Sequence, residues 1–380
     1  MSEREFIYVC RPQLPQADEI AGYLRSIDAR RFYTNRGPLV SLLEDRLAQA
    51  MERPRNTVRT TSSGTSALEV AILAHAGLAT PEKPVALIPS LTFAATGLAI
   101  ERCGYRAHFV DVDPETWAID ADALARHPMI GEAGLIVSVA PYGMLPDVAA
   151  LERLQAATGV PVVLDAAAAF EQVVAAPAPV SDALPMTLSF HATKTFSTGE
   201  GGAVIWGDSD GQDRVIQVAN FGFFLSRECK VAGTNAKMSE YHAAIGLAML
   251  DGFEARKRDY ATVIDAYRGA AEGRNLGGRL HLPPRLSSAY VLYEADTPER
   301  FAAAEAYLMD TRIETRRWYE AGQHAQPHFA RCAADPLPVT ESLGARLLGL
   351  PMAHDLAPDD VAEIVTRLEE AATRGAAPGA

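Results

Sequence analysis

Hydrophobic and polar positions at the start of the chain repeat at helical spacing. Ile20, Leu24 and Ile27 predict an amphipathic helix over 16–28, and the leucines of 38–51 predict a second helix that begins at Pro38. Proline is favoured in the first helical turn, because the N–H group that it lacks has no partner within the helix there. We therefore expect two helices before the first strand.

The pattern then changes to short apolar runs that alternate with longer amphipathic segments. The apolar runs lie at 85–88, 107–112, 135–140, 161–166, 187–192 and 202–207, and the helical segments at 64–78, 93–103, 120–127 and 146–158. Strands without polar alternation, each followed by a helix, indicate a mostly parallel sheet that helices cover on both faces. We therefore predict an α/β fold.

From Ser239 onward a single long helical pattern predicts one continuous helix. It is longer than most globular helices, as expected for a helix that leaves one domain for another. A strand-like run and two further helices follow, at 289–295, 298–309 and 358–372. We predict a large domain over residues 1–247 and a small C-terminal α/β domain over residues 248–380.

Composition narrows the class of protein. The chain has 380 residues, of which 48% are hydrophobic, and 35 Lys+Arg against 48 Asp+Glu give a net charge of −13. This acidic excess argues against nucleic acid as a partner, because nothing neutralises a run of phosphates. The longest apolar stretch, 84–100, is interrupted by Pro89 and diluted by Ser90, Thr92 and Thr96, so no membrane span is expected. The charged N-terminus and the four scattered cysteines predict a cytoplasmic protein.

The segment SFHATKTFSTGEGGAV at 189–204 carries the strongest chemical signal. A predicted strand ends at His191, Lys194 follows, and a glycine-rich loop leads to the next strand. Side chains at the carboxyl ends of parallel strands face the ligand crevice in such folds. A lysine that is partly removed from water there can form a Schiff base. A lone lysine on a turn is usually a surface residue, but the surrounding pattern favours chemistry here.

Asp165 ends the apolar run 162–165. Its carboxylate is costly to bury without a cationic partner or several hydrogen bonds. A protonated pyridine nitrogen is one such partner, and an acid beside it maintains the ring as an electron sink. A strand-end aspartate that caps the next helix is an equally good explanation.

The segment TTSSGTSALEV at 60–70 places Gly64 between hydroxyl residues at the start of a predicted helix. Free N–H groups and the positive helix end make an anion site there, with hydroxyls from Ser63, Thr65 and Ser66. Many helix N-termini have the same pattern, so this segment is a weak signal by itself.

In combination, these segments resemble the DegT/DnrJ/EryC1/StrS sugar aminotransferases, which are pyridoxal-phosphate (PLP) enzymes of fold type I. The similar segments lie in the same order along the chain, at 33–48, 61–72, 88–100, 109–120, 164–170, 189–204, 233–250 and 348–353. The resemblance implies a large PLP-binding domain with a mostly parallel sheet between helices, followed by a small α/β domain.

The resemblance also implies roles for individual residues. Positions that bind the cofactor in the family correspond to Gly64, Thr65, Phe93, Asp165, Ser189, Lys194 and Asn235. Lys194 corresponds to the catalytic lysine that holds PLP as a Schiff base and moves the proton. Asp165 corresponds to the acid beside the pyridine nitrogen, and Phe93 to a ring stacked on the cofactor. Asn235 corresponds to a residue that reaches the phosphate from the neighbouring subunit, which implies a homodimer with shared active sites.

One position departs from the family pattern. Relatives have Gln or His where this chain has Ala168, so a hydrogen bond near the cofactor is absent, supplied elsewhere or replaced by water. This departure bears on the identity of the substrate more than on the type of reaction. A branch of the family that dehydrates its substrates has His in place of the lysine, and Lys194 argues against that branch.

The function implied is transfer of an amino group, with L-glutamate as donor, to a nucleotide-linked keto-sugar such as a dTDP- or GDP-4-keto-6-deoxyhexose. An aminotransferase for a cyclitol or an amino-shikimate-type ketone is the alternative within the family. A PLP-binding member without turnover is a second alternative, motivated by Ala168. A cofactor-free Schiff-base aldolase is a third, which the phosphate-binding segments disfavour.

Other chemically notable residues give weaker evidence for a functional site. His324 and His328 are four positions apart, but no acidic or cysteine partner adjoins them in the sequence, so no metal site is predicted. Residues 316–319, Arg-Arg-Trp-Tyr, fit either a nucleotide pyrophosphate or a solvated edge. Tyr142 and His191 lie at predicted strand ends, where either a structural or a functional role is consistent with the pattern.

Overall fold

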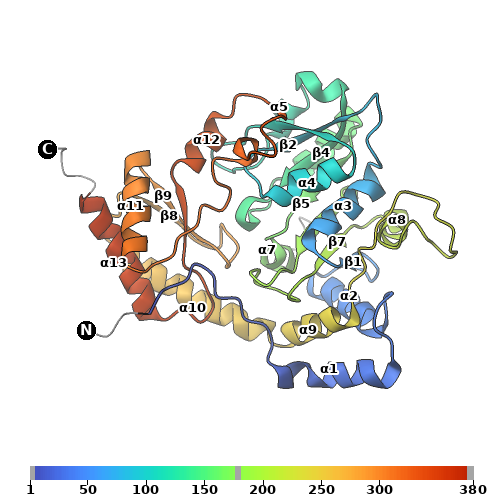
Figure 1. Cartoon of the computed structure of the whole chain (residues 1–380), viewed down its shortest axis with the longest axis horizontal. Helices are drawn as coiled ribbons and strands as arrows, with labels where there is room; N and C mark the ends of the chain where they lie inside the picture. Colours follow the sequence, from blue (N-terminus) through green and yellow to red (C-terminus); the bar gives the residue numbers. More distant parts are fainter. Residues whose placement is uncertain (1–4, 176–180, 375–380) are drawn as a thin grey trace. The chain divides into compact units, whose positions relative to one another are not determined.

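The computed structural model describes residues 5–175 and 181–374 (Figure 1). The chain divides into a large unit, Gln13–Asp251 with Gln323–Val339, and a small unit, Met1–Pro12, Gly252–Gly322 and Thr340–Ala380. The main division therefore follows Asp251, close to the predicted position 247. The two units cannot be separated at one position along the chain. The segment that ends at Pro12 belongs to the small unit, and Gln323–Val339 belongs to the large unit, because each makes its contacts with residues distant in sequence.

The large unit is built around an eight-stranded sheet with the order β1-β7-β6-β5-β4-β2-β3-β10. Its strands are β1 Val58–Thr61, β2 Val85–Pro89, β3 Arg106–Val110, β4 Ala133–Val139, β5 Val162–Asp165, β6 Met186–Ser189, β7 Gly202–Ile205 and β10 Ala333–Ala334. The central strands pair in parallel, whereas β7 runs antiparallel to both of its neighbours. The prediction of an α/β fold with a mostly parallel sheet is confirmed.

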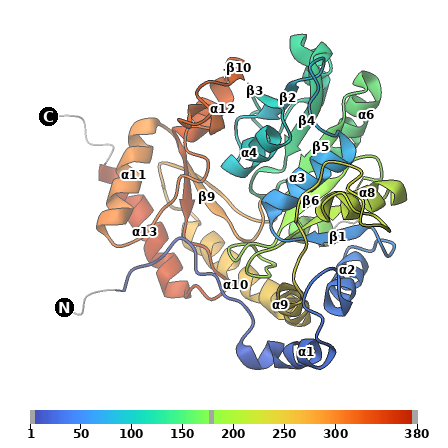
Figure 2. The same ribbon diagram turned by 45° about the vertical axis from the view of Figure 1, so that its right-hand side comes forward.

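Helices surround this sheet. They are α1 Ala17–Arg30, α2 Pro38–Ala50, α3 Gly64–His75, α4 Ala94–Arg102, α5 Ala121–Leu124, α6 Val148–Thr158, α7 Phe170–Ala175, α8 Ser209–Ala219 and α9 Glu240–Asp251. Helix α3 packs on β1, β5, β6 and β7 and lies beside α8 (Figure 2). Its buried face consists almost entirely of small and branched apolar residues, which allows close approach to the sheet. Because α3 lies against these strands, its N-terminus is fixed relative to their ends.

Four elements of the large unit were not predicted, namely β1, α7, α8 and β10. Strand β1 has the sequence VRTT, which lacks an apolar run, yet all four residues are buried. Thr60 on this strand bonds to a buried carboxylate: Glu44 accepts hydrogen bonds from the Thr60 N–H and hydroxyl at 2.9 and 3.1 Å. Since this partner lies on α2, the strand is stabilised by a tertiary contact that has no local signal.

The continuous helix predicted from Ser239 is wrong as a single element. Helix α9 ends at Asp251, and α10, Phe253–Ala271, begins after Gly252. Glycine is unfavourable in a helix interior because it loses more backbone entropy than other residues, so it marks the break.

The small unit has a three-stranded antiparallel sheet of order β11-β9-β8, from Leu347–Leu350, Val291–Ala295 and Gly278–His281. Helices α10, α11 Pro298–Asp310 and α13 Pro358–Arg374 pack with it around a core that includes Tyr267, Leu308 and Ile364. The first residues of α12, Pro338–Gly344, belong to the large unit. No helix in the described part of the chain combines the length and the apolar character needed to span a membrane.

Glu294 on β9 holds an ion cluster in the small unit. It accepts hydrogen bonds from His281 at 2.8 Å and Arg279 at 3.0 Å, and it pairs with Arg346 at 3.1 Å. The hydrogen bond from His281 lowers the pKa of Glu294 to about 2, and the two arginines reinforce this, although partial burial opposes it. The ionised carboxylate therefore stabilises the folded small unit.

We predict that Glu294→Gln lowers the free energy of unfolding at neutral pH by about 2 kcal/mol, allowing for solvent screening. Because the folded pKa is depressed, this stabilisation is complete above the ordinary value of 4.5 and is lost as the pH falls towards 2. Thermal unfolding of both proteins over this pH range measures the difference. Glu254→Gln, at an exposed ion pair on α10, is the matched control. A difference between wild type and Glu294→Gln that does not shrink in acid contradicts the prediction.

Candidate active site

Strands β1, β5 and β6 end at the same edge of the large unit's sheet. Asp165 pairs with Thr187 on β6, and Ser189 and Thr61 both lie opposite Gly202 on β7. The carboxyl ends of such strands are where ligands bind in open α/β sheets. The fold therefore brings Asp165, Ser189 and the start of α3 to one edge.

The start of α3 touches the end of β6. Ser63 and Ser66 cap the helix reciprocally, each side chain accepting the other's N–H at 3.0 and 2.9 Å. A Cβ at Gly64 would lie 2.6 Å from the Cβ of Ser189, and one at Gly202 would lie 2.5 Å from the Ser63 carbonyl oxygen. Only glycine allows this approach, so both glycines are needed to place the helix start beside Ser189.

This helix start offers donors to an anion. The N–H groups of Gly64 and Thr65 occupy the first two helical positions, which have no acceptor within a helix. The Ser189 oxygen accepts the His191 N–H at 3.3 Å, which leaves the hydroxyl proton to donate. The helix dipole adds a positive potential at the same place. The donor set fits a phosphate group.

Asp165 is buried at the end of β5. Its oxygens accept hydrogen bonds from the Thr96 hydroxyl at 2.8 Å and the Ala167 N–H at 3.2 Å. Burial raises the pKa of Asp165, whereas these two bonds and the charge of Lys194 lower it, and the net direction is upward. A cation placed against this carboxylate would offset the cost of burial, and a protonated pyridine nitrogen is such a cation.

A pair of threonines supports Asp165. Thr96 donates its only hydroxyl proton to Asp165, so the 2.7 Å contact between Thr92 and Thr96 requires Thr92 to donate to Thr96. Both threonines are buried. The sequence pattern identifies them only as polar interruptions of an apolar stretch. Their spacing of four residues was the one available signal, since it places both on one side of the start of α4.

We predict that Thr96→Val lowers turnover about tenfold and moves the acid limb of the pH–rate profile to higher pH. The reason is that a buried carboxylate loses a charge-assisted hydrogen bond, which is worth about 1.5–3 kcal/mol. Thr96→Ser retains the hydroxyl and is expected to restore both properties. A Thr96→Val variant with an unchanged pH profile would exclude this role.

Lys194 lies half-buried on the loop between β6 and β7. Its N–H donates to the His191 carbonyl at 2.9 Å, which forms a turn. The loop is anchored on both sides by buried rings: Phe196 stacks on Phe170 with centroids 4.4 Å apart, and Phe190 meets Phe196 edge-on at 4.9 Å. The strand ends at Ser189 rather than at His191 as predicted. The ring cluster thus fixes the backbone on either side of Lys194.

The remaining predicted residues are less closely grouped. Phe93 precedes α4 and is 63% exposed, so its ring is available to a ligand. Asn235 is exposed, and its amide oxygen accepts a hydrogen bond from the Lys237 ammonium at 2.6 Å. Its side chain is not bonded to the Gly64 turn within this chain. Ala168 is buried, and its methyl group offers no hydrogen bond in place of the family's Gln or His.

The other sequence candidates have separate partners. His324 contacts the Ser90 hydroxyl at 2.7 Å, and His328 contacts Glu101 at 2.7 Å. The two histidines therefore do not converge on a common point. The acidic partner of His328 is far away in sequence, so it could not be found from neighbouring residues.

Arg316 and Arg317 in the small unit pair with Glu314 and Glu305, respectively. These contacts are compatible with both explanations left open for residues 316–319. Tyr142 is buried with a positive φ of 53°, and His191 is exposed. Their placement at strand ends agrees with the pattern, without assigning a role to either.

His108, His127 and Asp335 form a cluster that the sequence does not predict. Its nitrogen and oxygen atoms lie within 4.8 Å of one another. His127 accepts the Met129 N–H on Nδ1, so its Nε2 carries the proton and donates to Asp335 at 2.8 Å. His108 contacts the other oxygen of Asp335 at 2.9 Å. These mutual bonds explain the cluster without a metal ion, and they fasten the segment around β10 to β3.

Comparison with known proteins agrees with this architecture. The DegT/DnrJ/EryC1/StrS aminotransferase family model matches residues 15–369. Protein Rv3402c of Mycobacterium tuberculosis is 32% identical over 378 residues, covering 96% of this chain and 90% of that protein. The dTDP-4-amino-4,6-dideoxy-D-glucose transaminase of Shigella dysenteriae is 27% identical over 376 residues, covering 96% and 98%. The crystal structure of DesI in the presence of its TDP-sugar product aligns with a TM-score of 0.86 at 30% identity, covering 98% and 95%.

The fold and these matches define an aminotransferase. The chain belongs to the DegT/DnrJ/EryC1/StrS aminotransferase family, whose model spans nearly its whole length. The predictions of family, fold class and enzymatic class are confirmed.

Proposed function

We propose that this chain is a PLP-dependent aminotransferase that transfers an amino group from L-glutamate to a nucleotide-linked keto-sugar. The observation that carries the proposal is the placement, at one sheet edge, of a buried carboxylate within the field of Lys194 and a phosphate-sized donor set at Gly64 and Ser189. The Shigella transaminase and DesI, by their names, support a nucleotide sugar as substrate. A dTDP- or GDP-4-keto-6-deoxyhexose is the proposed substrate class.

The residues present fit PLP at each end. Gly64, Thr65 and Ser189 would bind its phosphate, Asp165 its ring nitrogen, and Phe93 one face of its ring. When bound, PLP supplies an electron sink for the charge that develops as the donor loses its Cα proton. The protein's part is to orient the group, keep the ring nitrogen protonated and move the proton.

Lys194 is the proposed proton carrier. Its amine would hold the cofactor and, once free, would take the proton that leaves the donor's Cα. It would pass that proton to the cofactor, and in the second half-reaction it would take a proton back from the cofactor and deliver it to the sugar carbon that receives the nitrogen. The rings of Phe190 and Phe196 pack together and hold the backbone on either side of Lys194. Asp165 stays ionised throughout, supported by Thr96.

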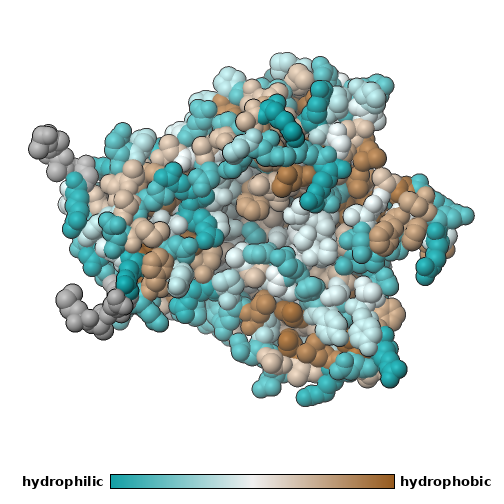
Figure 3. Space-filling view, viewed as in Figure 1, coloured by the Kyte–Doolittle hydropathy of each residue, from teal (hydrophilic) through white to brown (hydrophobic). Residues whose placement is uncertain are grey.

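We further propose a homodimer with shared sites, in which Asn235 reaches the cofactor phosphate of the neighbouring subunit. In support, Asn235 is exposed, and Leu225 in the loop after α8 is 96% exposed. Figure 3 shows hydrophobic side chains on the surface at the right of the view, where Figure 1 places this loop. Sedimentation tests the assembly. Mixing Lys194→Ala with Asn235→Ala subunits tests the shared site, because only mixed dimers contain one intact site. Mixtures that stay inactive after subunit exchange would exclude sharing.

The decisive experiment follows the cofactor spectrum through each half-reaction. Single-turnover conversion of the PLP form by L-glutamate is expected, and the absence of any change with all amino donors would favour a binding protein without turnover. The pyridoxamine form is then titrated with a panel of keto-sugar nucleotides, cyclitol ketones and amino-shikimate-type ketones. Reaction only with ketones that lack a nucleotide would replace the proposed substrate. A colourless protein that does not respond to added PLP would restore the aldolase alternative.

A further inference from the structure

Gln323 is a buried polar residue that the proposed chemistry does not use. It begins the short helix η3, Gln323–Ala325, and lies in the segment 323–339, which belongs to the large unit. The residue is only 1% exposed. Glutamine is mostly found at protein surfaces, because burying its amide costs free energy unless the amide is hydrogen-bonded. The contacts of this amide therefore need an explanation.

Gln323 bonds to both ends of the short segment between β2 and α4. Its backbone N–H donates to the Ser90 carbonyl at 2.8 Å, and its side-chain Nε2 donates to the Ala94 carbonyl at 3.1 Å. The next residue reinforces the first of these contacts, since the His324 N–H donates to the Ser90 hydroxyl oxygen at 3.1 Å. One residue thus joins the two ends of the segment 90–94.

The segment 90–94 carries two residues of the candidate active site. Phe93 offers the ring that is proposed to stack on the cofactor. Thr92 donates a hydrogen bond to Thr96, the residue that supports Asp165. Because the exposed ring of Phe93 has few packing neighbours, its position depends on the backbone that carries it. The two bonds of Gln323 hold that backbone on either side of the ring.

Gly97 on α4 leaves the space that the Gln323 amide occupies. A Cβ at Gly97 would lie 2.4 Å from Nε2 of Gln323 and 2.8 Å from Cε1 of Phe329. Atoms that are not bonded to each other do not approach so closely, and the amide is the end of a flexible side chain. An alanine at this position would therefore displace the amide from the Ala94 carbonyl.

Stability alone does not account for a glutamine at position 323. Within the described part of the chain, its Oε1 atom is buried and has no hydrogen-bond partner. A buried acceptor without a donor lowers the stability of the fold, whereas an apolar side chain of similar size would fill the same space without that cost. A residue that is unfavourable for stability, and that bonds to a segment of the active site, is typical of a functional role.

We propose that Gln323 is a positioning residue for the cofactor site. It fixes the backbone of the segment 90–94 and, through it, the ring of Phe93 and the hydroxyl of Thr92. Without this anchor the segment samples several positions, and a bound ring loses a pre-organised stacking partner. The part played by Phe93 rests on the proposed function, whereas the anchoring of the segment is a property of the chain itself.

The test uses Gln323→Met, which removes the amide and keeps nearly the same volume, so wild-type thermal stability is expected. In the apoprotein, hydrogen–deuterium exchange of the backbone amides of 90–97 should become about threefold to tenfold faster, because the bond to the Ala94 carbonyl is lost. In the holoprotein, the Kd for PLP should rise by about the same factor, and the visible circular dichroism of the bound cofactor should decrease. Gly97→Ala, which displaces the amide from the helix side, is expected to give the same changes.

His328→Met is the matched control, since it removes a 2.7 Å contact with Glu101 at the opposite end of α4 from Phe93. Exchange of 90–97 and PLP affinity should stay within about twofold of wild type. Unchanged exchange in Gln323→Met would overturn the proposal, and so would equal effects in His328→Met, which would indicate a general loosening of α4. Faster exchange with unaltered PLP affinity and dichroism would overturn the role in the cofactor site. If wild type binds no PLP, the proposed function fails, and the exchange measurement alone decides whether Gln323 anchors the segment.

Discussion

Replacing Lys194 with alanine is expected to abolish transamination and the visible absorption band of the bound cofactor together. The lysine has two roles in the proposed chemistry, as covalent anchor and as proton carrier, and one substitution removes both. Loss of a residue with both roles typically lowers turnover by about 10⁴-fold or more. Absorbance of the purified protein and single-turnover kinetics with L-glutamate measure the two effects separately.

Lys257→Ala is the matched control for this experiment, since it removes an exposed lysine of the small unit that pairs with Glu254. It should leave both the absorption and the rate unchanged. A small free amine added to Lys194→Ala should restore part of the proton transfer, because it supplies the missing base. Full turnover by Lys194→Ala would exclude the proposed mechanism.

Asp165→Asn has the second largest expected effect. The variant should still bind PLP, because the proposed phosphate donors at Gly64 and Ser189 are untouched and the amide has nearly the size of the carboxylate. Its turnover should fall by about 10²–10⁴-fold, since a neutral amide does not keep the ring nitrogen protonated and the electron sink is weakened. Fluorescence titration of the apoprotein with PLP measures binding, and steady-state kinetics measure turnover.

Asp265→Asn, at an exposed ion pair of α10, is the control for the change of charge. Turnover close to wild type in Asp165→Asn would remove Asp165 from the mechanism. Loss of PLP binding with an intact fold would instead show that the carboxylate contributes chiefly to affinity. The Thr96→Val experiment separates these effects further, because it perturbs Asp165 while its charge remains.

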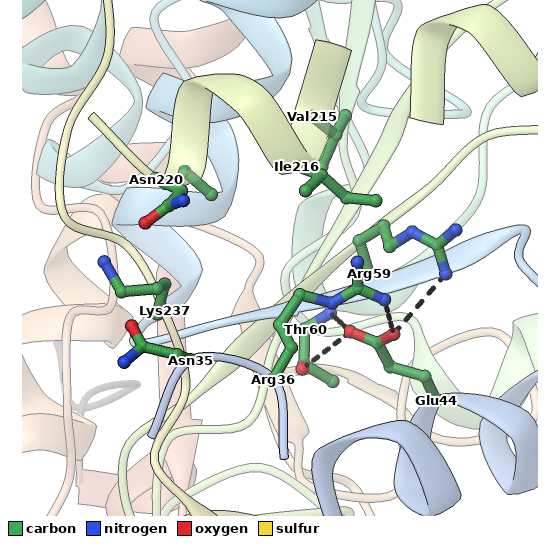
Figure 4. Close-up of a pocket in the computed structure, with 10 residues that line it drawn as sticks. Asn35, Arg36, Glu44, Arg59, Thr60, Val215, Ile216, Asn220 and Lys237 are labelled. Atoms are coloured by element: carbon green, nitrogen blue, oxygen red, sulfur yellow. Dashed lines mark hydrogen bonds and ion pairs between the residues drawn. The ribbon is translucent and has the colours of Figure 1, made fainter. Parts of the chain in front are cut away.

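The parallel pairing of the central strands and the membership of the family were predictable from the sequence, because both depend on residue patterns within short segments of the chain. Buried strands without polar alternation, each followed by an amphipathic helix, favour one class of sheet. The motif that contains Lys194, a lysine followed by a glycine-rich loop between two strands, also lies within one short segment of the chain. Polar strand β1 and the break at Gly252 were missed for complementary reasons. Strand β1 depends on a hydrogen bond to Glu44, which lies on α2 (Figure 4). At Gly252 the apolar periodicity continues on both sides of the glycine, so the pattern does not show that α10 begins there.

The fold class, the family and the candidate residues could be predicted from the chain's periodicity and motifs alone. Which of these residues lie together in space is set by the packing of the folded chain. The contact of Gly64 with Ser189, the bond from Thr96 to Asp165 and the ring cluster around Lys194 each join segments from different strands and helices. Such contacts depend on strand order and close packing, and neither is encoded in the spacing of residues within a single segment.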